Sequence, residues 1–315
     1  MNLQTKQTIA LECRNYIYEN GLSQSDFAAK AGMGKEFITH ILKEDSDFTY
    51  SAGKNKVVNI ADKYFTRIAE FIGLQLSKSY WEVQPTSQLT AAISILKDAK
   101  EFGATNLIIG DTGAGKTHAV DLFYRKNPAD TFVVTIGSSD NLADIIDKII
   151  DQLKITTGKT KSKKLRDIAS KLRNLKENGA NPQLIMDEAE YMKIPALCAT
   201  KELYDYLHKH ASIILIGTPQ LLKNLDSLRK KDKPGIPQFY RRIKFGIRQL
   251  PTVDRSFKLF LNGLSKPVQA FLTQICDNYG ELHDVLVPVR READRTGEEI
   301  TVPFIKKVLN LSNQY

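Results

Sequence analysis

Short runs of β-forming residues alternate with amphipathic segments through the middle of the chain. The runs, which are mostly apolar, lie at residues 105–109, 132–136, 183–186, 212–216 and 244–250. The segments between them have the apolar spacing of helices, each about ten to fifteen residues long, at residues 88–101, 116–126, 140–153, 163–178 and 196–209. Buried strands that alternate with helices are typical of a parallel sheet covered on both faces. The pattern predicts an α/β domain over about residues 86–250.

The flanking segments have helical patterns without such strands. Residues 1 to about 45 read as short helices, residues 46–54 as a polar loop or linker, and residues 57–76 as an amphipathic helix. From about residue 254 the chain also reads as helical, with breaks expected at Tyr279-Gly280 and at 295–297. We therefore expect a helix-turn-helix domain and linker at 1–54, a core with a helical lead-in at 55–251, and a helical lid domain at 252–315.

The N-terminal segment has the spacing of a helix-turn-helix. A helix over 24–31, capped by Ser23 or Ser25, is followed by a Gly-Met-Gly turn and a second helix over 35–43. Small Ala28 allows the two helices to cross closely. The second helix would then present Lys35, Thr39, His40 and Lys43 to a DNA major groove. Because the segment is not basic overall, an ordinary helical hairpin that contacts proteins stays open as an alternative.

The formal net charge is +9, and the excess lies in the middle of the chain. Two basic stretches carry it, one at about 154–176 and one at about 223–248. A lysine run is often a solvated surface, but two such stretches favour a polyanionic partner, most simply double-stranded DNA. The candidate DNA contacts in these stretches are Lys159, Lys161, Lys163, Lys164, Arg166, Lys230 and Lys231.

Composition excludes several classes of protein. Apolar residues make up 42% and charged residues 26%, both ordinary for a globular domain. No apolar run is long enough to span a bilayer, so no membrane partner is expected. Three scattered cysteines do not make a disulfide framework or a zinc site. Because the N-terminus lacks the apolar core of a signal peptide, we expect a cytoplasmic, nucleoid-associated protein.

The most informative motif lies between the strand at 105–109 and the helix at 116–126. Its sequence, Gly-Asp-Thr-Gly-Ala-Gly-Lys-Thr at 110–117, matches G-x-x-x-x-G-K-[ST] in a strand–loop–helix context. Such a loop surrounds a phosphate with backbone N–H groups at a helix N-terminus. Lys116 would contact the β- and γ-phosphates, and the Thr117 hydroxyl would bind Mg²⁺. The predicted nucleotide-binding residues are Gly110, Asp111, Thr112, Gly113, Ala114, Gly115, Lys116, Thr117 and His118.

Further candidate residues lie where the later strands end. Asp187, at the end of a buried strand expected beside the phosphate-loop strand, would hold Mg²⁺, and Glu188 would polarise an attacking water. Thr218 could orient that water or serve as a turn residue before Pro219. Arg241 and Arg242 could reach a phosphate in a neighbouring subunit; binding to DNA phosphates or to a surface carboxylate is an equal alternative.

Taken together, these motifs resemble the AAA+ ATPases. In chain order, Gly110–Thr117, Asp187-Glu188, Thr218 and the segment 239–243 look like Walker A, Walker B, sensor 1 and the arginine-finger box. The segment 214–221 and the double arginine are most similar to the MuB, TnsC, TniB and IstB group of transposition ATPases. The helix-turn-helix is similar to the N-terminal domains of phage repressors and of MuB.

The C-terminal residues resemble the helical lid of the initiator and MuB-like clades. The similar segments are 279–286, 290–293 and 299–301. There is one departure, since His283 stands where many relatives have the sensor 2 arginine, three residues after the glycine. The role of a cation there could pass to Arg290 or Arg291.

The resemblance implies a fold and a function. The fold is a P-loop NTPase (AAA+) with a parallel-sheet core, an N-terminal helix-turn-helix domain and a C-terminal helical lid. The function is that of a DNA-stimulated ATPase that uses ATP and Mg²⁺, binds DNA largely independently of sequence, and forms a ring or helical filament. As in the MuB group, it would select target DNA and activate a transposase. A replication initiator or helicase loader, or an ATP-switched transcription regulator, remain alternatives.

Overall fold

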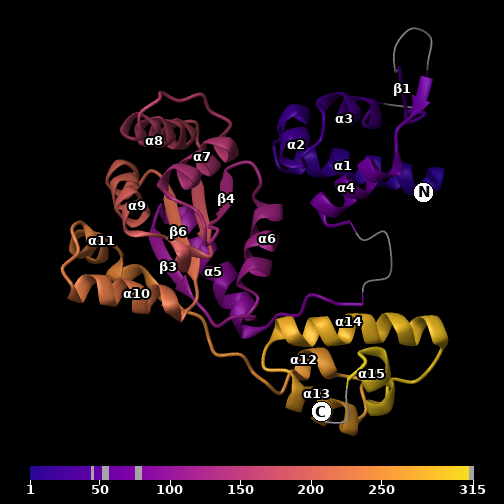
Figure 1. The fold of residues 1–315 in the computed structure, drawn as a ribbon. Helices are drawn as coiled ribbons and strands as arrows, with labels where there is room; N and C mark the ends of the chain where they lie inside the picture. The colour runs from indigo at the N-terminus through magenta and orange to yellow at the C-terminus, as the bar shows by residue number, and fades with distance from the viewer. Residues whose placement is uncertain (44–45, 52–56, 75–79, 312–315) are drawn as a thin grey trace. The chain divides into compact units, whose positions relative to one another are not determined.

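We describe the protein from a computed structural model. It describes residues 1–43, 46–51, 57–74 and 80–311. The chain divides into two compact units (Figure 1). The first comprises Met1–Ser79 with Arg125–Ala129, and the second comprises Tyr80–Tyr124 with Asp130–Tyr315. Among the described residues, no helix combines the length and the apolar character that crossing a bilayer requires.

The first unit is a small helical domain with a two-stranded hairpin. Its elements are α1 (Leu3–Glu19), α2 (Gln24–Lys30), α3 (Lys35–Ile41), β1 (Thr49–Ser51), β2 (Val57–Asn59) and α4 (Asp62–Ile72). The two helices predicted for the helix-turn-helix are present as α2 and α3. Ser23 is the N-cap of α2, since its hydroxyl accepts a hydrogen bond from the Asp26 N–H at 3.1 Å.

The first unit extends further than the expected boundary at residue 54. The reason is that the amphipathic face of α4 packs into the same core as α1, α2 and α3. Phe65, Ile68 and Ala69 of α4 are buried there together with Ile9 and Phe27. The antiparallel pairing of β1 with β2 also replaces part of the predicted polar loop; residues 52–54 of that loop lie outside the described residues.

The second unit contains a five-stranded parallel sheet, which confirms the predicted α/β class. The strand order is β4-β5-β6-β3-β7. The strands are β3 (Thr105–Ile109), β4 (Thr131–Thr135), β5 (Gln183–Asp187), β6 (Ser212–Gly217) and β7 (Ile247–Gln249). The expected last strand at 244–250 is shorter than predicted, because its first three residues form the short 3₁₀ helix η2 (Lys244–Gly246).

Helices cover both faces of this sheet, as the continuous apolar strands require. Side chains along a strand alternate between faces, so Ile108, Ile185 and Ile214 pack on the side of α5 (Ser87–Phe102) and α6 (Lys116–Lys126). The other face is covered by α7 (Leu142–Leu153), α8 (Lys161–Glu177), α9 (Ile194–Leu207), α10 (Pro219–Lys230) and α11 (Ile236–Ile243). The short 3₁₀ helix η1 (Ala189–Tyr191) follows β5.

The first basic stretch is not helical up to Thr160, whereas the second contains helices over residues 223–230 and 236–243. The first becomes helical at Lys161, where the Thr160 hydroxyl caps α8 by accepting from the Lys163 N–H at 3.3 Å. In the second stretch, residues 223–230 lie on α10, which Pro219 begins at its first turn. The opposite faces of α8 and α10 are buried, through Leu165 and Leu225.

The C-terminal residues of the second unit form a helical lid. It consists of α12 (Lys258–Leu261), α13 (Lys266–Ile275), α14 (Tyr279–Thr296) and α15 (Val302–Val308) around one apolar cluster. The break expected at Tyr279-Gly280 is displaced, because Asn278 caps α14 and Gly280 lies in its first turn. The break at 295–297 is confirmed, since Gly297 ends α14 with a left-handed φ of 71°.

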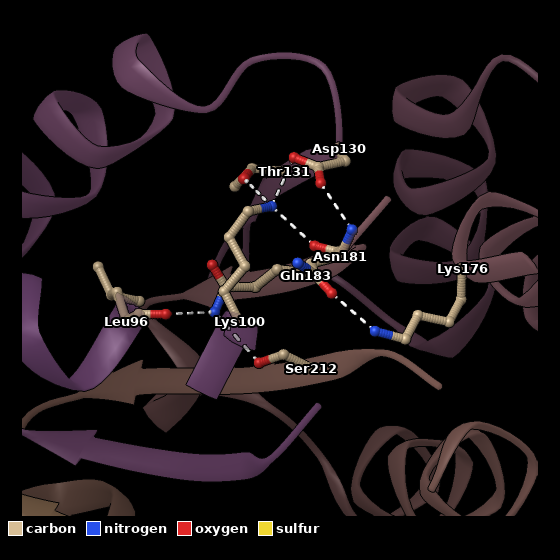
Figure 2. Close-up of polar contacts among 8 residues, drawn as sticks. All are labelled: Leu96, Lys100, Asp130, Thr131, Lys176, Asn181, Gln183 and Ser212. Atoms are coloured by element: carbon tan, nitrogen blue, oxygen red, sulfur yellow. Dashed lines mark hydrogen bonds and ion pairs between the residues drawn. The ribbon is translucent and has the colours of Figure 1, made fainter. Parts of the chain in front are cut away.

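A half-buried ion pair ties α5 to the beginning of the sheet (Figure 2). The Lys100 ammonium lies 2.5 Å from an Asp130 carboxylate oxygen and also donates to the Asn181 carbonyl at 2.8 Å. The second Asp130 oxygen accepts from the Asn181 N–H at 2.9 Å. Burial lowers the pKa of Lys100, while the pairing with Asp130 opposes that shift. The pair therefore depends on each partner compensating for the desolvation of the other.

Neighbouring polar contacts extend this cluster across two strands. The Gln183 amide on β5 donates to the Leu96 carbonyl at 3.0 Å and to the Ser212 hydroxyl at 3.1 Å (Figure 2). Gln183 and Ser212 are both fully buried. These bonds hold α5, β5 and β6 together at the end of the sheet where the strands begin.

Replacing Lys100 with Met should destabilise the second unit. The substitution leaves the Asp130 carboxylate partly buried without its cation, which costs about 3 kcal/mol in the free energy of unfolding. Urea unfolding measures this loss. Lys97→Met is the matched control, because Lys97 is an exposed lysine on the same helix. If the two variants were equally stable, the ion pair would not support the fold.

Candidate functional site

The glycine-rich loop connects β3 to α6 as the sequence predicts. Two of its glycines have left-handed backbones, with φ of 72° at Gly113 and 83° at Gly115. These angles disfavour any residue with a side chain. At Gly113 there is also no room, because a Cβ would overlap the Asn278 side chain at the start of α14. The loop is therefore shaped both by its glycines and by the lid packed against it.

Lys116 is the first residue of α6 and lies over the loop. Its ammonium donates to the carbonyl oxygens of Gly110 and Asp111, both at 2.8 Å. Burial lowers the pKa of this lysine, while the nearby carboxylates, above all Glu190 and then Asp187, oppose the shift. A cation held inside a ring of carbonyls and carboxylates can bind the phosphate groups of a nucleotide.

The Thr117 hydroxyl donates to a carboxylate oxygen of Asp187 at 2.8 Å. Asp187 is 2% exposed, and its other oxygen accepts from the Glu188 N–H at 2.9 Å. The sequence analysis placed the Asp187 strand directly beside the phosphate-loop strand, which is wrong because β6 lies between β5 and β3. Thr117 and Asp187 still meet, because the loop that follows β3 and the end of β5 lie at the same edge of the parallel sheet.

Glu188 and Thr218 lie at that same edge. Glu188 is exposed, with a left-handed φ of 57° that is uncommon for a residue with a side chain. Such strain often occurs at functional positions. Thr218 follows β6 and is the N-cap of α10, although its side chain makes no capping hydrogen bond.

Glu190 belongs to this group but was missed in the sequence analysis. One of its carboxylate oxygens is buried and has no hydrogen-bond partner among the described residues. The same oxygen lies against the backbone of Gly217, and its charge acts on Lys116. Its position three residues after Asp187 was the available signal. A buried carboxylate oxygen without a partner, beside the Asp187–Thr117 pair, fits a hydrated Mg²⁺ held at this edge.

A pocket of about 430 Å³ opens beside the loop. Residues 113–118 form one wall, and its other walls come from residues 81–89 and from the lid. The Trp81 ring stacks on Phe260 at 4.4 Å between ring centres, and the His283 ring meets Trp81 edge-on at 5.1 Å. The Tyr279 hydroxyl donates to the Gln88 side-chain oxygen at 3.1 Å. An apolar, aromatic wall next to a phosphate loop can hold a nucleoside.

The two candidate finger arginines have different surroundings. Arg242 is held within its own chain, because its guanidinium donates to Asp205 at 2.6 Å and to the Gln238 carbonyl at 3.0 Å. Arg241 is exposed at the end of α11. The structure therefore brings neither arginine to the glycine-rich loop within the same chain.

The candidate lysines of α8 fall into two groups. Lys163 pairs with Asp167 at 2.8 Å, and Lys164 pairs with Asp147 at 2.5 Å. The remaining basic candidates are exposed, namely Lys159, Lys161 and Arg166 near the start of α8 and Lys230 and Lys231 at the end of α10. The exposed residues are those that a polyanion could reach without breaking an ion pair.

On α3 of the first unit, Lys35, Thr39 and the following Lys43 are exposed and His40 is half-buried. The Thr39 hydroxyl donates to the Lys35 carbonyl at 3.1 Å. The buried face of the same helix, through Ile38 and Ile41, fixes which side chains point outward. The surface of α3 is thus available to a partner.

The chain is similar to known proteins in part of its sequence and in its fold. Residues 104–225 match the protein family described as an AAA domain. No curated protein sequence is similar enough to the chain to count as a match. Among solved structures, the Aeropyrum pernix ORC2 protein in its ADPNP–ADP complexes is similar, with a TM-score of 0.54 and 15% identity. That likeness covers 78% of this chain and 72% of the other.

Two further structures are similar to the same degree. CDC6P from Pyrobaculum aerophilum has a TM-score of 0.52 and 15% identity over 77% of this chain and 70% of its own. The Aeropyrum pernix ORC1 protein in complex with DNA has a TM-score of 0.54 and 13% identity over 76% and 68%. At such identities the likeness concerns the fold. Residues 104–225 are thus an AAA domain of the P-loop NTPase type, in a chain with a fold similar to that of the ORC and CDC6 AAA+ proteins.

Proposed function

We propose that the protein is an ATPase that assembles on double-stranded DNA when it binds ATP. The observation that carries this proposal is the junction of Lys116, Thr117 and Asp187 at the end of the sheet, next to an aromatic pocket. Groups suited to a phosphate, a metal ion and a nucleobase all meet at this junction. The known structures of similar fold include one with ADPNP and ADP and one with DNA.

The roles of the residues follow from their positions. The N–H groups of residues 113–117 and the Lys116 ammonium would bind the phosphates, and Thr117 and Asp187 would hold Mg²⁺. The metal would supply positive charge that neutralises the phosphate oxygens during transfer. Glu188 would accept a proton from the attacking water, and Thr218 would orient that water. The buried carboxylate oxygen of Glu190 would bind the hydration shell of the metal.

Assembly would complete the site. Because Arg242 is bound to Asp205, Arg241 is the arginine that is free to reach the phosphate of a neighbouring subunit. Subunits joined in this way would form a ring or a helical filament. The exposed basic residues of α8 and α10 would then follow the DNA backbone without reading bases, and α3 would make additional contacts.

Two biological roles are consistent with this biochemistry. The motif resemblance supports a target-selecting protein that activates a transposase. The likeness of fold to the ORC and CDC6 proteins supports a replication initiator or helicase loader. Electron microscopy with duplex DNA, with and without ATP and Mg²⁺, tests the shared proposal. A chain that stays monomeric on DNA at saturating ATP would overturn it.

Substitution of Lys116, the proposed phosphate-binding cation, and of Glu188, the proposed general base, should have different effects. Lys116→Ala should abolish both nucleotide binding and ATP-dependent assembly. Glu188→Gln should keep ATP binding but lower turnover by about 10²- to 10⁴-fold, the usual contribution of a general base. Nucleotide titration and a phosphate-release assay separate the two. Normal turnover of Glu188→Gln would remove this residue as the base.

Arg241→Ala and Arg242→Ala form a matched pair of adjacent substitutions. Arg241→Ala should leave the melting temperature unchanged and lower turnover by about 10³-fold or more. Arg242→Ala should lower the melting temperature, because Asp205 loses a partner at 2.6 Å. Mixing Arg241→Ala with Lys116→Ala subunits should restore part of the activity, since each supplies what the other lacks. A mixture as inactive as its components would contradict a shared site.

Neutralising exposed lysines of the α8 region should weaken DNA binding at every sequence. Lys159→Ala with Lys161→Ala should reduce the slope of log K against log salt by roughly 1.8, about 0.9 per phosphate contact. Lys258→Ala with Lys266→Ala is the control, because these two lysines are equally exposed but lie on the lid. Equal slopes for the two variants would show that the α8 region is an ordinary solvated surface.

A further inference from the structure

Three segments lie together at the edge of the sheet where β6, β3 and β7 begin, at the opposite end from the candidate nucleotide site. Each segment directly precedes one of these strands, and they comprise residues 208–211, 102–104 and 244–246. Because β6, β3 and β7 are parallel neighbours in this order, the segments follow one another across the sheet at the strand spacing of about 4.8 Å. We call these segments, with Ile247 and Arg248, the strand-start surface.

Two glycines allow the three segments to pack closely. A Cβ on Gly103 would lie 3.2 Å from the Lys209 carbonyl carbon, and a Cβ on Gly246 would overlap the Thr105 carbonyl oxygen. Gly103 also has a left-handed φ of 61°. The backbone next to each glycine is therefore held against the neighbouring segment, which fixes where the preceding residue leaves the surface.

The residue before each of these glycines is an exposed phenylalanine. Among the described residues, Phe102 and Phe245 are the most exposed phenylalanines, at 71% and 81%. Phenylalanine is among the residues most often buried. The Phe245 ring is also held in place, because the Arg248 guanidinium donates to the Phe245 carbonyl at 2.8 Å. Two large apolar rings, on the starts of adjacent strands, are thus presented to solvent, as at an interaction surface.

The same surface is cationic. Lys209, Lys244 and Arg248 are all exposed, and the Lys244 ammonium lies 4.6 Å from the centre of the Phe245 ring. The residue before Phe102 is an exposed acid, Glu101. The three cations therefore outnumber this adjacent carboxylate, and the rings lie in a region of positive potential.

An unpaired strand of nucleic acid carries both groups that such a surface can bind. Each base offers a π-face that stacks on an aromatic side chain, and each phosphate offers a negative charge to a nearby lysine or arginine. A double helix could bring phosphates to the cations, but its bases are stacked on one another and cannot cover the rings. An apolar peptide could cover the rings, but it would desolvate the cations without giving them partners.

We propose that the strand-start surface binds single-stranded nucleic acid, with bases stacked on the Phe102 and Phe245 rings and phosphates bound by the three cations. The surface shares no residue with the proposed ATP site or with the basic residues of α8 and α10 proposed for duplex DNA. The inference therefore goes beyond the proposed function and does not rest on it.

The test measures the anisotropy of labelled oligo(dT) and oligo(U) of about 15 nucleotides, near the usual size of a single-strand site, with the full chain and no ATP. Phe102→Ala with Phe245→Ala should weaken binding by about 25-fold or more, at least about fivefold for each stacked base. Phe102→Tyr with Phe245→Tyr should bind like wild type, because the π-faces remain. Tyr18→Ala is the matched control, since Tyr18 is 88% exposed in the first unit, and it should also bind like wild type.

Competition with relaxed, covalently closed circular duplex DNA distinguishes stacking from simple charge attraction. The alanine pair should bind this duplex as tightly as wild type does. An equal loss for the duplex and the oligonucleotides would overturn the inference, as would equal oligonucleotide affinities for wild type and the alanine pair. A loss with oligo(dT), with oligo(U) or with both supports it and identifies the sugar.

Thermal melts check that the variants are folded, and the exposure of both rings predicts unchanged melting temperatures. Because no nucleotide is present, a failure of the proposed ATPase function would leave this test unaffected.

Discussion

The hydrogen bond from the Thr117 hydroxyl to the buried Asp187 carboxylate joins residues that are 70 positions apart in the chain. It connects the first turn of α6, which follows β3, with the end of β5. In the sheet, β6 lies between β3 and β5. A carboxylate that is 2% exposed is costly to bury unless it is hydrogen-bonded. This one accepts from both Thr117 and the Glu188 backbone, so the requirement for partners brings together the residues of the proposed metal site and the proposed base, Glu188.

The strands β5 and β6 connect the candidate site with a polar cluster at the opposite end of the sheet. At the end where the strands begin, the Lys100–Asp130 pair and the Gln183 amide hold α5, β5 and β6 in place. At the other end, the same strands deliver Asp187 and Thr218. The polar cluster and the candidate site share strands but no side chains. A change in one should therefore affect the other only through the positions of the strands.

The pocket is lined by segments that lie far apart in the chain. Trp81 precedes α5, Phe260 belongs to α12 and His283 to α14, yet the Trp81 ring lies 4.4 Å from the Phe260 ring and 5.1 Å from the His283 ring, between centres. Gln88 joins the same parts, since it binds Tyr279 and the carbonyls of Pro251 and Thr252.

Sequence alone was enough to predict the α/β class, four of the five strands of the parallel sheet and the glycine-rich loop, because each depends on local apolar spacing and on the positions of glycines. It also predicted both helices of the helix-turn-helix. It did not reveal the order of the strands, the placement of α4 in the first unit, or the half-buried Glu190. Nor did it distinguish Arg241 from Arg242. These outcomes depend on contacts between residues far apart in the chain, where packing and ion pairing, rather than spacing, decide which side chains meet.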